Sequence, residues 1–129
     1  MPAGDGFSPA QRQRIDRAIR EAETVCRYEF SVYVGEAEGD PRGFAERLHG
    51  ALVAPDRSVL LMIDPARRVL EVVTGAEARR ELEDGEVALA VAEMQTHFAH
   101  QDLCAGIVRG IGMLAEHARK PPTLHAQES

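Results

Sequence analysis

One short segment in the middle of the chain is apolar at almost every position. It runs from Ser58 to Ile63 and reads Ser-Val-Leu-Leu-Met-Ile. A strand with one face in water alternates apolar and polar side chains, whereas a strand that is covered on both faces is apolar throughout. The segment therefore predicts the central strand of a sheet that carries helices on both of its faces.

Two further strands are expected beside this central one. Residues 28–34 alternate apolar and polar side chains, and residues 68–73 follow the central strand after Asp64-Pro65-Ala66-Arg67. Proline presets a turn angle and aspartate can bond the following amides, so this tetrapeptide predicts a tight hairpin turn. The first strand reaches the central one through a helix, which predicts a parallel crossover. The hairpin then adds an antiparallel third strand.

The rest of the chain has apolar residues at helical spacing, with capping residues before several of the helices. The expected helices begin at Pro9, at Pro41, at Ala76, after Asp84 and after Asp102, with Ser8, Asp40, Asp84 and Asp102 as N-caps. The fold class predicted is α/β, a three-layer sandwich in which helices cover both faces of a small mixed β-sheet. A single domain is expected over residues 8–120, with a flexible N-terminus (1–7) and a flexible tail (121–129).

Composition narrows the classes of partner. The chain has 129 residues and a net charge of −6, with 15 Lys+Arg against 21 Asp+Glu. Nucleic-acid binding needs a basic surface, so no nucleic-acid partner is expected. A protein partner is expected instead. No segment has the roughly 18 apolar residues that span a bilayer. Two cysteines, Cys26 and Cys104, lie far apart and are expected to be unbridged, as in a cytoplasmic protein.

The hairpin brings distant residues together. A two-residue loop at Pro65-Ala66 would pair the central strand with its return strand so that Asp56 lies opposite Gly75. Thr74 and Gly75 would then precede the short helix that begins at Ala76. Because a helix N-terminus beside a glycine attracts anions, Thr74 and Gly75 are candidate residues for binding an anion or a nucleotide.

Three carboxylates are expected near the same place. Asp56 lies beside the short helix, Glu77 in its first turn, and Asp84 after it. Clustered carboxylates repel unless a cation relieves them, so Asp56, Glu77 and Asp84 predict a site for Ca²⁺ or Mg²⁺. The alternative is structural: Asp56 in a turn, Glu77 favoured by the helix dipole, Asp84 as an N-cap, and Arg57 as an internal counter-charge.

Two weaker constellations remain open. His97 and His100 share a helix face and suit zinc if a third ligand converges, but histidines also stabilise a helix C-terminus. Cys104 and Arg109 are one residue short of the spacing in the loop of cysteine-dependent phosphatases, and a buried structural thiol is the alternative. The sequence contains no Gly-x-Ser-x-Gly elbow, Walker A loop or Gly-x-Gly-x-x-Gly.

Several segments together resemble the TPM domain family. The resemblance covers roughly residues 8 to 118. It rests on four segments, namely Asp56–Asp64, Arg67–Gly75, Leu82-Glu83-Asp84, and Phe98–Asp102 through Gly106-Ile107. The chain looks most like the compact actinobacterial members. The resemblance implies a βαβ-type sheet between helices, and it implies acid phosphatase activity and calcium or magnesium binding at the acidic residues.

Two functions therefore compete. The first is a non-enzymatic interaction or accessory module, which the absence of a recognisable nucleophile favours. The second is a divalent-metal-dependent acid phosphatase that acts on phosphomonoesters, which the resemblance and the acidic residues favour. Anion or nucleotide binding at Gly75 is a third, weaker reading.

Overall fold

The computed structural model describes residues 6–119 of the chain. The elements follow the order α1, β1, α2, η1, β2, β3, η2, α3, α4, where η marks a short 3₁₀ turn. Their bounds are α1 Pro9–Cys26, β1 Glu29–Val34, α2 Pro41–Gly50, η1 Pro55–Arg57, β2 Ser58–Asp64, β3 Val69–Thr74, η2 Ala78–Arg80, α3 Asp84–Ala99 and α4 Leu103–His117.

The sheet confirms the predicted topology. Its three strands lie in the order β1-β2-β3, with β1 parallel and β3 antiparallel to β2. Each residue of β2 is buried, as the continuous apolar run predicts. Within residues 6–119, β1 and β3 are therefore the two edge strands, and each has one side that no other strand covers.

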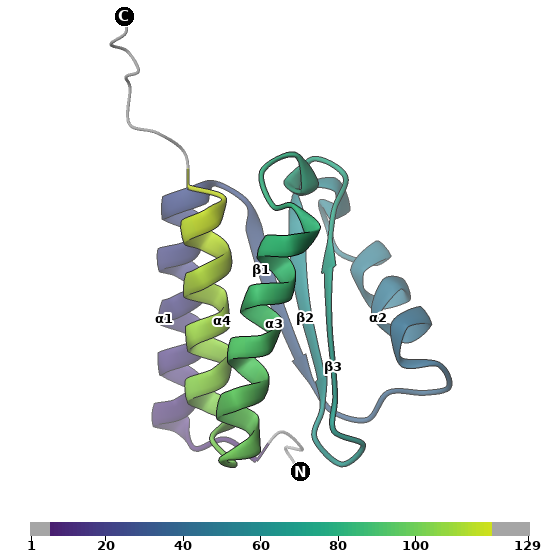
Figure 1. The fold of residues 1–129 in the computed structure, drawn as a ribbon, viewed down its shortest axis with the longest axis vertical. Helices are drawn as coiled ribbons and strands as arrows, with labels where there is room; N and C mark the ends of the chain where they lie inside the picture. Colours follow the sequence, from purple (N-terminus) through teal and green to yellow (C-terminus); the bar gives the residue numbers. More distant parts are fainter. Residues whose placement is uncertain (1–5, 120–129) are drawn as a thin grey trace, which may run out of the picture.

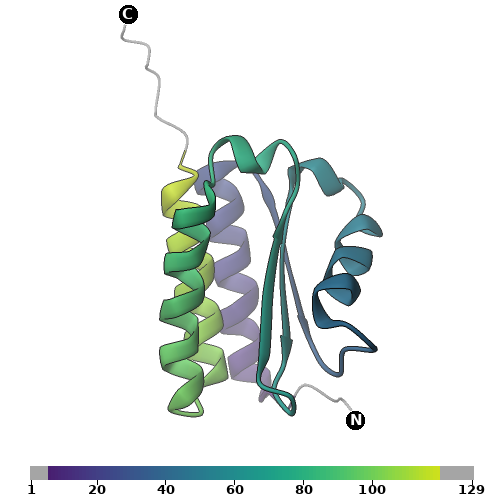
Figure 2. The ribbon, with the colours of Figure 1, turned by 45° about the vertical axis from the view of Figure 1, so that its right-hand side comes forward.

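Helices cover both faces of this sheet, so the predicted three-layer α/β sandwich is confirmed. Figures 1 and 2 show α1, α3 and α4 on one face and α2 on the other. The β2 side chains divide accordingly: Val59, Leu61 and Ile63 pack with the three helices, whereas Leu60 and Met62 pack on the α2 side. Burial of these aliphatic side chains is the main source of stability in a core with few aromatics.

The hairpin differs from its prediction. The loop has four residues, 65–68, because Asp64 pairs with Val69 rather than with Arg67. The Oδ1 atom of Asp64 accepts a hydrogen bond from the amide of Arg67 at 3.3 Å, and Arg68 takes a left-handed φ of 56°. The register is thus shifted by two residues. A shift of two residues keeps each side chain on its expected face, so the predicted core residues are correct although the predicted strand pairing is wrong.

Two local predictions after the hairpin are also wrong. The helix expected from Ala76 to Leu82 is only the three-residue turn η2. Asp84 is not an N-cap: Glu83 caps α3 through a capping box with Glu86, and Asp84 is the first residue of the helix. The other capping predictions are confirmed, since Ser8, Asp40 and Asp102 each accept a hydrogen bond from the first turn of their helix.

Helices α3 and α4 pack closely because α4 presents glycines to α3. A Cβ atom added to Gly106 would lie 2.5 Å from the ring of Phe98, and one added to Gly110 would lie 2.3 Å from the sulfur of Met94. Cys26 and Cys104 are free and buried, which confirms that they are not bridged.

No helix within residues 6–119 is both long and apolar enough to cross a membrane. The N-terminal residues 1–5 and the tail expected over residues 121–129 lie outside the described part of the chain.

Candidate functional site

The predicted acidic site maps to one end of the molecule, around the segment between β3 and α3. The two segments expected to meet there do meet. The amide of Gly75 donates to the carbonyl of Ser58 at 2.9 Å, and the amide of Glu77 donates to the carbonyl of Asp56 at 2.9 Å. The shifted register thus places Asp56 opposite Glu77 instead of Gly75. A Cβ atom on Gly75 would lie 2.0 Å from the carbonyl oxygen of Pro55, so only glycine fits this contact.

Glu77 has a cation of the protein beside it. Its Oε2 atom lies 2.6 Å from Nη1 of Arg57. The same guanidinium donates to the carbonyl of Arg27 at 2.7 Å and lies over the ring of Tyr28, 5.4 Å from its centre. Arg57 is therefore an internal counter-charge that ties three segments together, which is the structural alternative that the sequence left open.

The three predicted carboxylates do not form a ready-made ligand set. Within residues 6–119, no three His, Cys, Asp or Glu side chains are grouped so that they could hold a metal ion. Asp56 and Asp84 are both exposed, and Asp84 lies in the first turn of α3, where the helix dipole favours an acid. Cation binding by Asp56, Glu77 and Asp84 remains a prediction.

The anion prediction for Thr74 and Gly75 depended on a helix after Gly75, and the structure has only the three-residue turn η2 there. A three-residue 3₁₀ turn does not build the dipole of a longer helix. Thr74 is buried, and its carbonyl accepts a short hydrogen bond from the guanidinium of Arg79. The residues meet where the sequence placed them, but the argument for an anion there no longer holds.

The histidine pair has local partners. His97 lies 3.4 Å from Glu93, and the ring of His100 bonds the carbonyl of Thr96 at 2.9 Å. No third ligand joins them within the described chain. Cys104 is buried in α4 and approaches the carbonyl of Gln11 at 3.7 Å, as a structural thiol does.

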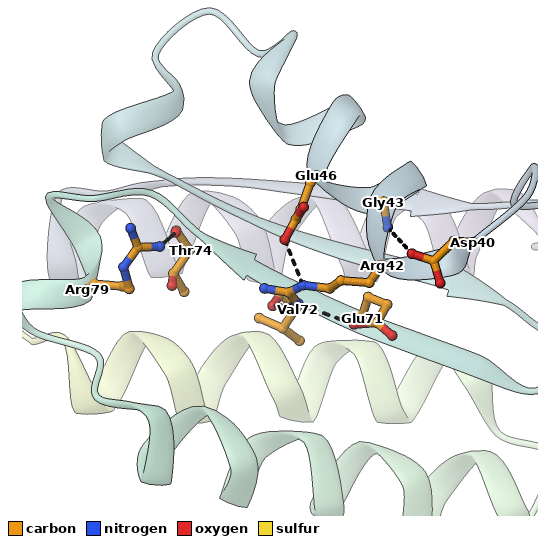
Figure 3. Close-up of polar contacts among 8 residues, drawn as sticks. All are labelled: Asp40, Arg42, Gly43, Glu46, Glu71, Val72, Thr74 and Arg79. Atoms are coloured by element: carbon orange, nitrogen blue, oxygen red, sulfur yellow. Dashed lines mark hydrogen bonds and ion pairs between the residues drawn. The ribbon is translucent and has the colours of Figure 1, made fainter.

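The outer edge of β3 is covered by arginines. Arg42 of α2 donates to the carbonyl of Val72 at 2.9 Å and to the carboxylate of Glu71 at 3.2 Å, and Arg79 bonds the carbonyl of Thr74. Figure 3 shows both guanidinium groups against this strand. Side chains that occupy the polar groups of an edge prevent another strand from pairing there. The edge of β3 is therefore closed along its second half.

The outer edge of β1 is closed only at its beginning. The carboxylate of Glu23 in α1 accepts a hydrogen bond from the amide of Phe30 at 3.1 Å, so the polar groups of Phe30 face outward. Alternate residues of a strand direct their polar groups to the same edge, so those of Val32 and Val34 also face outward. No described residue forms a hydrogen bond with the main chain of Val32 or Val34 on this side.

A groove lies beside this open part of β1. It has a volume of about 230 Å³, and five of its seven lining residues are apolar, with Arg12 and Asp16 as the two charged ones. Figures 1 and 2 show that β1 runs obliquely away from α1 towards its own C-terminal end. We call this feature the edge groove, and its lining residues are Phe7, Arg12, Ile15, Asp16, Ile19, Val32 and Val34.

Sequence reasoning missed the edge groove, although the relevant residues were placed correctly. Ile15, Ile19, Val32 and Val34 were all expected on apolar faces, and all four pack against the core. Whether such faces leave a groove depends on the strand order and on the angle between α1 and β1. Neither quantity is encoded in local periodicity, so no signal in the sequence identified this site.

Comparison with solved structures supports the same fold. The chain resembles the BA42 protein of Bizionia argentinensis with a TM-score of 0.81 and 17% identity, over 90% of this chain and 83% of that chain. It resembles the N-terminal domain of the cg2496 protein of Corynebacterium glutamicum with a TM-score of 0.75 and 12% identity, over 95% of this chain and 86% of that chain. At such identities, the likeness establishes the fold alone.

Sequence comparison places the chain in a family. It is 28% identical over 109 residues to two uncharacterized proteins of Mycobacterium tuberculosis, MT2543 of strain CDC 1551 / Oshkosh and Rv2468c of strain ATCC 25618 / H37Rv. The match covers 84% of this chain but 65% of each relative, so the chain spans less than two thirds of their length. Residues 2–115 match the domain of unknown function DUF5130, and the chain therefore belongs to the DUF5130 family.

Proposed function

We propose that the protein is a non-enzymatic interaction module that binds an extended segment of a partner protein along the open part of β1. The observation that carries this proposal is the edge groove. There, the outward-facing main-chain groups of Val32 and Val34 in an edge strand adjoin a hollow between a strand and a helix, which apolar side chains line together with Arg12 and Asp16.

The chemistry of this site suits a strand better than a small molecule. An extended peptide that adds to a sheet edge forms main-chain hydrogen bonds with it, and alternate side chains enter the pockets beside the edge. Here the amides and carbonyls of Val32 and Val34 would supply the hydrogen bonds. Ile15 and Ile19 of α1 would receive an apolar side chain of the peptide.

The contrast between the two edges supports the choice of β1. Proteins commonly block their edge strands, since an open edge invites aggregation. On β3, guanidinium groups occupy the carbonyls of Val72 and Thr74. On β1, Glu23 occupies only the amide of Phe30. The second half of the β3 edge is thus protected, whereas the second half of the β1 edge is open.

The expected affinity is moderate. Each main-chain hydrogen bond contributes about 1 kcal/mol net, and the small groove admits few side chains. A complex of this kind falls in the low-area class of interfaces, with a Kd on the order of 10 µM.

The test begins with a displayed library of random peptides, from which those that bind the protein are selected. A selected peptide is then synthesised and titrated against the protein. Val34→Pro removes one outward amide at a position where an edge strand tolerates proline, and it should weaken binding at least about tenfold. Val34→Thr keeps that amide and is the matched control. Equal affinity for the two variants, with both folded by circular dichroism, would overturn the proposal.

A second experiment separates main-chain pairing from apolar contact. N-methylation of alternate amides of the selected peptide removes the hydrogen-bond donors along one edge of the peptide strand and leaves its side chains unchanged. Loss of binding in one alternating set supports strand addition. Undiminished binding of both sets contradicts it, and concentration-dependent dimerisation of the protein through the same residues would place a second copy in the groove instead.

We further propose divalent-cation binding at Asp56, Glu77 and Asp84 as an accessory property of the module. The support is the main-chain hydrogen bond that brings Glu77 beside Asp56. The resemblance to the TPM domain family supports the alternative function, in which the bound cation would serve an acid phosphatase. Hydrolysis of p-nitrophenyl phosphate with and without Mg²⁺ tests that alternative.

We also propose a cytoplasmic location, which two free, buried cysteines suit.

A further inference from the structure

A larger cavity lies at the end of the molecule opposite the predicted acidic site. It has a volume of about 400 Å³ and lies where the β2–β3 turn adjoins the α3–α4 turn. Figures 1 and 2 show both turns at the same end of the sandwich. Pockets for small ligands have volumes of roughly 300 to 1,000 Å³, so the cavity is large enough for one. It shares no lining residue with the edge groove.

The apolar part of the cavity comes from the rigid elements of the fold. Ile63 of β2, Phe98 of α3 and Leu103 of α4 line it, and all three belong to the core or pack against it. An aromatic ring and two branched aliphatic side chains favour an apolar group of ligand by burying it from water. Because these side chains are held by the core, this part of the cavity is pre-formed.

The polar part of the cavity comes from the two turns and from the end of α3. Arg68 lies in the β2–β3 turn, Gln101 in the α3–α4 turn, and Gln95 near the end of α3. Arginine supplies a permanent positive charge with several donors, and each glutamine supplies an amide donor. Arg68 carries the only charge among these three side chains, so they favour a ligand with negative charge.

Two of these polar residues occupy backbone conformations that glycine would adopt with less strain. Arg68 has a φ of 56° and Gln101 a φ of 61°, both in the left-handed region. A side chain in that region costs roughly 1 to 2 kcal/mol, and strained residues of this kind gather at ligand sites. Both positions lie on the turns that line this cavity.

The remaining charged group of the cavity is already engaged. Asp64 also lines it, but its carboxylate is buried and accepts hydrogen bonds from the amides of Ala37 at 3.0 Å and of Arg67 at 3.3 Å. The guanidinium of Arg67 is directed to the carbonyls of Ala37 and Gly39. Asp64 therefore fixes the turn, and Arg68, which is exposed and pairs with no described side chain, is the residue of that turn whose guanidinium remains for a ligand.

We infer that this cavity binds a small amphipathic anion, namely a carboxylate that carries an aryl or short alkyl group. The apolar group lies against Phe98 and Leu103, and the carboxylate accepts hydrogen bonds from the guanidinium of Arg68 and the amide of Gln101. Charge-assisted hydrogen bonds to a planar guanidinium give the preference for a carboxylate over a neutral group of the same shape.

The experiment titrates the 129-residue chain with 4-phenylbutyrate and with its neutral amide, and binding of each probe is measured from the ¹⁵N chemical shifts of the protein. The carboxylate should bind about tenfold more tightly than the amide. Arg68→Gln should remove that preference and leave the affinity for the amide unchanged. Arg80→Gln, which makes the same change of charge at the opposite end of the molecule, is the matched control and should leave both affinities unchanged.

A second variant tests the location. Ala99 lines the cavity and is exposed, so Ala99→Phe should fill the cavity without disturbing the core and should abolish the binding of both probes. Ala88→Phe places the same side chain at another exposed position of α3 and should have no effect. Equal affinity of the two probes, a preference that survives Arg68→Gln, binding that survives Ala99→Phe, or no binding up to about 10 mM would each overturn the inference.

Discussion

The Nη1 atom of Arg42 donates a hydrogen bond of 2.9 Å to the main-chain carbonyl of Val72, so a side chain from α2 closes part of the outer edge of β3. The same guanidinium contacts Glu46 and Glu71 at 3.2 Å each. One arginine thus connects the α2 layer to the strand that would otherwise present a row of free polar groups. The contrast between this edge and that of β1 supports the proposed function.

Removing this arginine is expected to expose the edge of β3. Arg42→Ala should lower the free energy of unfolding by about 1 kcal/mol, the net contribution of a hydrogen bond that water partly replaces. It should also cause self-association that increases with protein concentration. Urea unfolding and sedimentation measure the two effects. Glu46→Ala removes only an exposed ion pair and should cost at most about 0.5 kcal/mol, with no self-association.

The contact at Gly75 should be one of the least tolerant positions of the chain. Gly75→Ala would place its Cβ atom 2.0 Å from the carbonyl oxygen of Pro55, and neither backbone segment can move freely. We expect a loss of about 3 kcal/mol or more in the free energy of unfolding. Gly112→Ala, in open space within α4, should instead stabilise the protein by up to about 1 kcal/mol. Similar losses at the two positions would contradict this account of Gly75.

The α3–α4 turn should become more stable with glycine at its left-handed position. Gln101 donates to the carbonyl of Phe98 at 2.9 Å and Asp102 donates to that of His97 at 3.1 Å, which is the Schellman pattern. Gln101→Gly should raise the free energy of unfolding by about 0.5 to 1 kcal/mol. Gln95→Gly, within α3, should lower it by about 0.5 kcal/mol. A decrease in both variants, in thermal unfolding, would contradict the argument from strain.

The cation prediction can be tested with Ca²⁺ and Mg²⁺ alone. A cation that binds only the native state must raise the unfolding temperature. If Asp56, Glu77 and Asp84 bind it, the double variant Asp56→Asn, Asp84→Asn should lose that increase. Glu36→Gln with Glu38→Gln removes the same charge elsewhere and should retain it. A full increase in the first double variant would exclude these carboxylates as the site.

Much of the fold could be predicted because its determinants are local. The apolar run of β2 predicted a strand covered on both faces, and the caps at Ser8, Asp40 and Asp102 marked three helix starts that the structure confirms. The hairpin register could not be predicted in the same way. It depends on Arg68 adopting a left-handed φ, a conformation that glycine or asparagine usually indicates and arginine does not.

The candidate sites were harder to predict because they are not local. The segments around Asp56 and Gly75 were correctly expected to meet, and Arg57 was considered as an internal counter-charge, but only the geometry shows that its partner is Glu77. The edge groove depends on the strand order and on the divergence of β1 from α1. Both arise from the packing of whole elements, and no run of residues encodes them.

The most direct test of the proposed function is hydrogen exchange at the amides of β1, measured by NMR with and without a selected peptide. In the free protein, the outward amides of Val32 and Val34 should exchange at least about tenfold faster than the inward amides of Ser31 and Tyr33. Saturating peptide should slow Val32 and Val34 to the rate of their inward neighbours. Unchanged exchange at Val32 and Val34 under saturating peptide, with protection elsewhere, would contradict strand addition at β1.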